Sequence, residues 1–272
     1  MEVGDVNERK IMSERILIDH GGDGVSHITL HAPEKRNALD AASVVALTQA
    51  FQACDEEEST RVIIITGSPG AFCAGGDIGT FGSKADTRVR RRGARLVDSI
   101  LATEKPIIAR VNGAAVGLGL TIALLADITI ASDNSKFGDT HVNLGAVAGD
   151  GVALILPLLI GPQRAKELLL TGRIIDAHEA ARIGMIFNVV SVEELDGEVE
   201  KLATSLKRQP PYATRATKAA INQLIKTASR DVLDLALAYE EVSRSLPEHG
   251  EAVEAWRKSH AKAKDVPAAP TS

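Results

Sequence analysis

Val111–Ser132 reads VNGAAVGLGLTIALLADITIAS and carries the pattern that decides the fold. An apolar strand over residues 107–111 enters a turn of small residues, and a helical stretch then leads through Asp127 into a second apolar strand. Gly117 and Gly119 allow another group to approach the backbone of this turn. The first turn of a helix offers unpaired N–H groups and the positive end of the helix dipole. The turn therefore suits an anion or a developing oxyanion, or alternatively it only allows close packing of helix on strand.

Length and composition indicate a globular protein with a large aliphatic core. The 272 residues suffice for one large domain or two small ones, and 44% of them are hydrophobic although only 3% are aromatic. A net charge of −5 argues against a nucleic-acid binder. The two cysteines match neither a disulfide framework nor a metal site, so we expect no metal. The same cysteine usage predicts a cytoplasmic protein, and the polar start of the chain and its short apolar runs predict neither a signal peptide nor a membrane span.

Strands and helices alternate to about residue 190, after which only helical patterns follow. The expected strands cover residues 16–18, 25–31, 62–66, 107–111 and 187–192, and the last four helices cover 193–207, 211–227, 230–246 and 248–262. Alternation of this kind is typical of α/β crossover units around a largely parallel sheet. We therefore predict an α/β core over residues 15–200, a helical region over residues 201–263, and flexible tails at 1–14 and 264–272.

A second stretch with chemical character is FCAGGDI, residues 72–78, which follows a predicted strand. Its small residues leave backbone N–H groups accessible. Together with the turn at Gly117–Gly119 it can supply two N–H donors to one oxygen, which is the arrangement of an oxyanion hole. The sequence leaves open whether the two turns meet in space.

Four motifs in a fixed order resemble the crotonase (enoyl-CoA hydratase/isomerase) superfamily. They are EKRNAL (34–39), FCAGGDI (72–78), VNGAAVGLGL (111–120) and FGDTHVNLG (137–145), and the resemblance extends from about residue 16 to residue 261. It implies a spiral of ββα units followed by a helical C-terminal region that packs in a homotrimer or a dimer of trimers. It also implies an acyl-CoA substrate, whose thioester enolate two backbone N–H groups stabilise, with no cofactor beyond the coenzyme A of that substrate.

Carried over by position, the resemblance assigns the oxyanion hole to the N–H groups of Gly76 and Leu118. The substrate-binding positions that it implies are Lys35, Arg36, Ala38, Ala74, Asp77 and Thr121. Lys35 and Arg36 have the charge to meet coenzyme A phosphates, although a solvated basic pair explains them as well.

The departures from the family pattern concern the acid–base residues. The two glutamates of the hydratases map onto Thr121 and His141, and a threonine hydroxyl is no general base at neutral pH. His141 is followed nine residues later by Asp150; an imidazole is a competent base near pH 7, and a carboxylate can orient it. This pair resembles the β-diketone hydrolases of the oxocamphor hydrolase type, a resemblance that adds Glu240. Asp139 is interpreted mainly as a turn or cap residue.

Three hypotheses follow. In the first, the chain is an enzyme, a lyase or hydrolase, that hydrates or hydrolyses an acyl-CoA with Gly76, Leu118 and a His141–Asp150 pair. In the second, the same pair activates water to cleave a carbon–carbon bond of a small cyclic β-diketone. In the third, the chain is a non-catalytic relative that binds acyl-CoA, which the loss of the glutamate at Thr121 keeps open.

Overall fold

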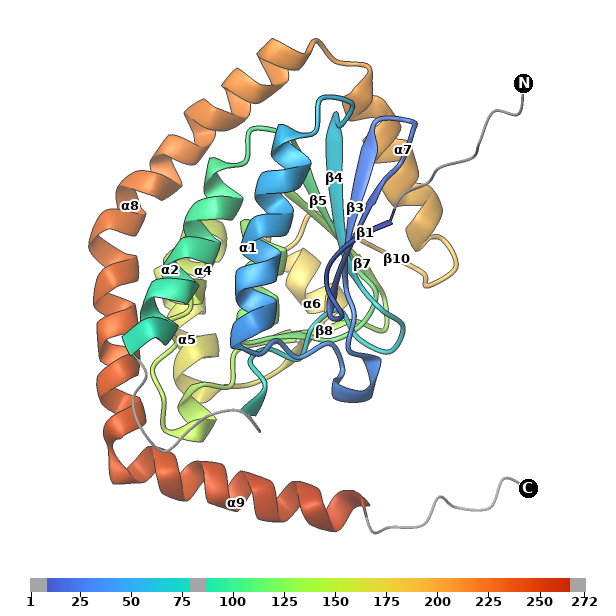
Figure 1. Ribbon diagram of the computed structural model, residues 1–272. Helices are drawn as coiled ribbons and strands as arrows, with labels where there is room; N and C mark the ends of the chain where they lie inside the picture. Colours follow the sequence, from blue (N-terminus) through green and yellow to red (C-terminus); the bar gives the residue numbers. More distant parts are fainter. Residues whose placement is uncertain (1–8, 79–86, 265–272) are drawn as a thin grey trace, which may run out of the picture.

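The computed structural model describes residues 9–78 and 87–264, and all structural statements concern these ranges. Figure 1 shows a central sheet with helices on both of its faces. The strands of this sheet, in spatial order, are β1 (Arg9–Ser13), β2 (Ile16–His20), β3 (Val25–Leu30), β4 (Val62–Gly67), β5 (Ile107–Val111), β7 (Ile128–Ser132) and β10 (Asn188–Val190). The predicted α/β class is confirmed.

Most of the sheet is parallel. Strands β3, β4, β5, β7 and β10 run parallel. At the edge, β2 pairs with β3 in the antiparallel direction, and β1 pairs with β2 in the same way. In register, Ile28 on β3 lies opposite Ile65 on β4, which in turn lies opposite Ala109 on β5. These runs are rich in β-branched residues because both faces of a parallel sheet are buried.

Strand β4 shows how the sheet divides the interior into two cores. Ile63 and Ile65 face the main core, which contains α1 (Ala41–Glu56), α2 (Thr87–Ala102), α3 (Leu118–Leu125) and α4 (Val152–Ile160). Val62 and Ile64 point to the opposite face and pack against α7 (Leu195–Lys207). The two-residue period of the strand thus supplies both helical layers.

A second, three-stranded sheet positions the chemistry. Its order is β6 (Ala115–Val116), β8 (Lys136–Gly138) and β9 (Ile175–Asp176). β6 leads directly into α3, and β8 leads to the short 3₁₀ helix η3 (Val142–Leu144), which His141 precedes. Because β6 and β8 pair in parallel, the start of α3 and the segment at His141 lie at the same end of this sheet.

Several helix starts follow the sequence signals. Asp40 accepts a hydrogen bond from the Ser43 N–H and caps α1. Asp176 caps α6 (Ala177–Arg182) in the same way, through the Glu179 N–H. Pro162 occupies the first position of α5 (Pro162–Thr171), where a missing N–H costs nothing. A short 3₁₀ helix, η1 (Pro33–Lys35), lies between β3 and α1.

The helical end of the chain wraps around the outside of the core. α8 (Pro211–Ser245) runs past α2 and α4, and α9 (Pro247–Lys264) then turns away at the lower end of the molecule (Figure 1). The sequence predicted two helices for the span of α8, but Ala228 and Ser229 are not helix breakers and the helix continues through them. The Lys218 ammonium ties α8 to the core, 2.7 Å from Asp127 Oδ2 and 2.8 Å from the Lys105 carbonyl.

The structure corrects two of the predicted boundaries. Arg9–Ser13 lies in the span expected to be a flexible tail, yet it forms β1, because its backbone pairs with β2. The boundary at residue 200 falls inside α7, whose apolar face packs on the sheet. Residues 1–8 and 265–272 of the predicted tails lie outside the described residues. Within the described ranges, no helix has both the length and the apolar character needed to cross a membrane.

Candidate active site

The two glycine-rich turns meet. Cys73 pairs with Ala115 in a parallel bridge, and the Cys73 carbonyl accepts a hydrogen bond from the Val116 N–H at 2.9 Å. Gly75, at φ +94°, passes so close to the second turn that a Cβ there would lie 2.8 Å from the Val116 oxygen and 3.6 Å from the Leu118 nitrogen. Only a glycine fits this backbone approach.

The N–H groups of Gly76 and Leu118 stand at this junction. Both residues are half-buried, and within residues 9–78 and 87–264 neither N–H donates to an acceptor. Leu118 is the first residue of α3, where the N–H groups are unpaired and the helix dipole is positive. The two predicted donors are therefore adjacent in space and available to an oxygen of a bound molecule.

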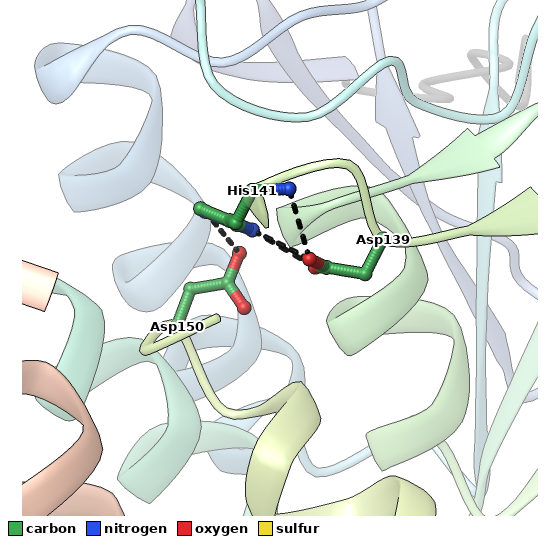
Figure 2. Close-up of side chains that lie close together, drawn as sticks. All are labelled: Asp139, His141 and Asp150. Atoms are coloured by element: carbon green, nitrogen blue, oxygen red, sulfur yellow. Dashed lines mark hydrogen bonds and ion pairs between the residues drawn. The ribbon is translucent and has the colours of Figure 1, made fainter. Parts of the chain in front are cut away.

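His141 lies beside this junction, with its Cε1 3.7 Å from the place where a Gly117 Cβ would be. The nearest partner of its imidazole is Asp139, both of whose carboxylate oxygens lie 2.9 Å from Nδ1 (Figure 2). The His141 backbone N–H also donates to Asp139 Oδ1 at 3.1 Å. The carboxylate that orients the ring is thus Asp139, in the role that the sequence analysis gave to Asp150.

Two further carboxylates face the other ring nitrogen. His141 Nε2 lies 3.9 Å from Asp150 Oδ2 and 3.8 Å from Glu240 Oε1. Figure 2 shows Asp139 and Asp150 approaching the ring from different sides. Asp150 and Glu240 are buried and belong to the loop before α4 and to α8, respectively. The structure therefore brings His141, Asp150 and Glu240 together. The two distances from Nε2 are too long for direct hydrogen bonds and are consistent with a bridging water.

Each of these two carboxylates has a partner of its own. The Thr121 hydroxyl donates to Asp150 Oδ1 at 2.9 Å, and the Arg244 guanidinium lies 2.5 Å from Glu240 Oε1. Thr121, predicted as a substrate-binding position, is almost fully buried, and its hydroxyl supports Asp150. Asp150 is no helix cap, because the residue at the N-cap of α4 is Gly151.

The charges of the cluster change the protonation of its members. Burial opposes the charged imidazolium, but the carboxylates of Asp139, Asp150 and Glu240 outweigh it and raise the pKa of His141 to about 10. Burial also raises the pKa of Asp150 to about 6, although charged His141 opposes this shift. The surrounding carboxylates thus favour the charged form of the His141 ring.

Asp139, His141 and Asp150 are also the cluster among the described residues whose ligand atoms lie close enough for a metal ion, all within 4.8 Å of one another. A proton on Nδ1, shared with Asp139 at hydrogen-bond distance, already accounts for the shortest of these contacts. We interpret the group as an ion-pair cluster.

The predicted coenzyme A loops also lie side by side. The Ala74 N–H donates to the Arg36 carbonyl, and the Lys35 ammonium is 2.6 Å from Asp77 Oδ2. Lys35 and Arg36 are exposed, whereas Ala38 is buried. The pairing with Asp77 means that a phosphate would share the Lys35 ammonium with a carboxylate.

Sequence reasoning underrated Asp139 and missed Arg244. The signal for Asp139 was its position two residues before His141, at the end of a strand, where one turn brings both side chains together. The signal for Arg244 was its spacing of four residues from Glu240 on one helix. Both spacings are common in proteins. They point to functional residues here only because His141 and Glu240 lie in the site.

Known proteins confirm the predicted crotonase-like fold. The chain matches the enoyl-CoA hydratase/isomerase family over residues 20–251. One relative is a crotonyl-CoA hydratase of Syntrophomonas wolfei, to which the chain is 39% identical over 202 residues. The aligned region covers 73% of this chain and 78% of the relative. It superposes with a TM-score of 0.85 on an enoyl-CoA hydratase/isomerase from Mycobacterium paratuberculosis, with 31% identity over 90% of this chain and 100% of the other.

A β-diketone hydrolase from the cyanobacterium Anabaena is also similar, with a TM-score of 0.79, 27% identity, and coverage of 85% of this chain and 94% of that protein. That structure was solved with (S)-3-oxocyclohexyl acetic acid bound.

Proposed function

The chain belongs to the enoyl-CoA hydratase/isomerase family, and from this membership we propose that it adds water to the double bond of an α,β-unsaturated acyl-CoA thioester. One observation carries the proposal: a half-buried His141 and a buried Asp150 lie beside two available N–H groups, those of Gly76 and Leu118. Hydration needs one group that accepts a proton from water and one that returns a proton to carbon. The pair supplies both without the two glutamates of the family pattern.

The chemistry follows from where charge develops. The thioester oxygen accepts hydrogen bonds from the Gly76 and Leu118 N–H groups, which become stronger as negative charge develops on it. A water molecule between His141 and Asp150 loses a proton to this pair and its oxygen attacks Cβ. The double-bond electrons move to Cα and onto the thioester oxygen as an enolate. The pair then protonates Cα, so that one water is added and no proton is gained or lost.

A second candidate function is hydrolysis of a carbon–carbon bond in a cyclic β-diketone. The observation that favours it is Glu240, which faces His141 from α8, together with the similarity to the Anabaena β-diketone hydrolase. In this reaction water attacks one carbonyl, the bond to the carbon between the two carbonyls breaks and opens the ring, and the enolate that forms is protonated at that carbon. The same pair would serve, with a substrate that lacks coenzyme A.

A substrate panel separates these functions. The purified protein is assayed with crotonyl-CoA, a β-ketoacyl-CoA and cyclohexane-1,3-dione, each also with His141→Gln and His178→Gln. His178 is an exposed histidine on α6 and provides the matched control. We expect hydration of crotonyl-CoA that His141→Gln reduces by about 10²–10⁴-fold and His178→Gln leaves unchanged.

The other outcomes are decisive as well. Turnover of the diketone alone would replace the first function by the second. Tight binding of acyl-CoA without turnover of any of the three substrates would favour the non-catalytic relative. Turnover that survives His141→Gln unchanged would exclude the His141–Asp150 mechanism in either enzyme.

The outer face of α8 supports assembly as a homotrimer or a dimer of trimers. Large apolar side chains on this helix are exposed in the single chain, among them Ile221, Leu224, Tyr239 and Val242. Exposed large apolar side chains that recur along one helix are a feature of protein–protein interfaces. Light scattering on the eluting protein tests the assembly, and a monomeric mass at micromolar concentration would contradict it.

A further inference from the structure

We propose that Asp139 is a positioning residue that keeps His141 protonated on both ring nitrogens, so that Nε2–H donates the proton in the reaction while Asp150 accepts the proton of water. This inference rests on the proposed function, because it assigns acid and base roles within the same site. It also reverses the sequence-based hypothesis, in which His141 was the base and Asp150 oriented it.

The first argument is the geometry at Nδ1. A carboxylate is only an acceptor, and both oxygens of Asp139 lie 2.9 Å from this nitrogen, so Nδ1 carries a hydrogen. Asp139 is buried and is held in place by the His141 backbone N–H. Burial makes the charge of Asp139 more effective on the ring than a solvated carboxylate would be.

The second argument is the surroundings of Nε2. In a Ser–His–Asp triad this nitrogen faces a hydroxyl and stays free to accept its proton. Here it faces the carboxylates of Asp150 and Glu240 instead, at 3.9 and 3.8 Å. Two anions on this side favour an Nε2–H donor, and they disfavour a neutral ring with a lone pair turned toward them.

The charged groups that face the ring within residues 9–78 and 87–264 point the same way. Asp139 comes from the ring's own segment, Asp150 from the loop before α4, and Glu240 from α8, with Arg244 as the cation that partners Glu240. With a neutral ring, the three carboxylates would lose the positive charge that all of them face. An imidazolium reduces this excess of negative charge, in agreement with the raised pKa of His141.

The third argument concerns Asp150, whose contacts suit it to accept a proton from water. Its Oδ1 receives the Thr121 hydroxyl at 2.9 Å, which leaves Oδ2 to accept from a water near the imidazolium. Its pKa, raised to about 6 by burial against the pull of His141, keeps it ionised at neutral pH and yet basic enough to take a proton. Thr121 therefore supports the base from the position where the family pattern has a glutamate.

The proton balance closes within the site. Asp150 takes a proton from water while the water oxygen bonds to Cβ and the double-bond electrons pass to the enolate. The Nε2–H of His141 then protonates Cα, which leaves a neutral imidazole and a protonated Asp150. Transfer of that proton from Asp150 to His141 across the 3.9 Å gap, directly or through a water, restores the starting state.

Nuclear magnetic resonance of protein labelled with ¹⁵N-histidine tests this assignment without a substrate. The chain has seven histidines, and His141→Gln identifies the signal by its loss. We expect His141 in the wild type to remain doubly protonated at pH 8, with its Nδ1 proton strongly downfield. Asp139→Asn keeps an oxygen acceptor beside Nδ1 but removes the charge, and it should lower the pKa of His141 by about 1–3 units. Asp133→Asn, at an exposed turn after β7, is the matched control and should leave it unchanged.

The pH profile of turnover gives a second readout. Loss of the Nε2–H at high pH should end activity, so Asp139→Asn should move the alkaline limb of kcat/KM downward by the same shift. A purely structural role for Asp139 would lower activity at all pH values and leave the limb in place.

Each outcome decides the proposal. A wild-type His141 that titrates near pH 6.5, or that lacks the downfield Nδ1 proton, overturns it even if Asp139→Asn does not fold. An unshifted pKa of His141 in a folded Asp139→Asn variant overturns the proposal as well. If crotonyl-CoA is not hydrated but His141 titrates as expected, the proposed function fails and the protonation assignment stands.

Discussion

Substitution of Gly75 by alanine tests the junction of the two glycine-rich turns. A Cβ at Gly75 would lie 2.8 Å from the Val116 oxygen and 3.6 Å from the Leu118 nitrogen, so the second turn has to move. Gly70 is a close control, because its φ of +106° is similarly unfavourable for alanine but nothing lies within 4 Å of a Cβ there. Both variants should lose about 1–3 kcal/mol from backbone strain, which a domain with roughly 5–15 kcal/mol of stability survives.

The two variants should differ in turnover. Displacement of one N–H donor of an oxyanion hole typically costs about 10²–10³ in kcat, so Gly75→Ala should be slower than Gly70→Ala by that factor. Hydration of crotonyl-CoA measures the rate, and denaturant unfolding of both proteins measures the stability. Equal turnover in two folded variants of equal stability would refute the assignment of this junction as the oxyanion hole.

Three further perturbations address stability and binding. The stabilisation from charged His141 is fully present below its unfolded pKa of 6.5 and is lost as pH rises toward its folded pKa of about 10. The free energy of urea unfolding should therefore decline over this pH range in the wild type, and His141→Gln should remove the decline. Lys218→Met should lower the free energy of unfolding by about 1.5–3 kcal/mol, because its carboxylate and carbonyl acceptors lose a charged donor, whereas Lys201→Met at an exposed ion pair should cost under about 1 kcal/mol in the same assay. Lys35→Ala should raise the KM for crotonyl-CoA roughly two- to fivefold but leave that for the crotonyl thioester of N-acetylcysteamine, which has no phosphates, unchanged.

The fold was accessible from sequence because its signals are local. The alternation of β-branched runs with helices predicted the parallel sheet, and capping residues such as Asp40 and Asp176 marked helix starts within a few residues. β1 was missed because its pairing with β2, rather than any apolar period, makes Arg9–Ser13 a strand. The continuity of α8 was missed because the small residues Ala228 and Ser229 were interpreted as the gap between two helices.

The candidate site was predictable in its members but not in their contacts. Motif positions gave His141, Asp150 and Glu240, and the structure brings these together. Which carboxylate meets which nitrogen depends on the turn between Asp139 and His141, whose dihedral angles no spacing specifies. The protonation of the ring depends in turn on charges from three separate segments, so it becomes an inference only when their distances are known.

The origin of Glu240 on α8 has a consequence for the newly made chain. During synthesis the sheet, both glycine-rich turns, His141 and Asp150 all emerge before α8 does. The group around His141 therefore lacks one carboxylate and its guanidinium partner until α8 itself has been made. A nascent polypeptide held on the ribosome would already contain the sheet but not the electrostatic environment of the finished enzyme.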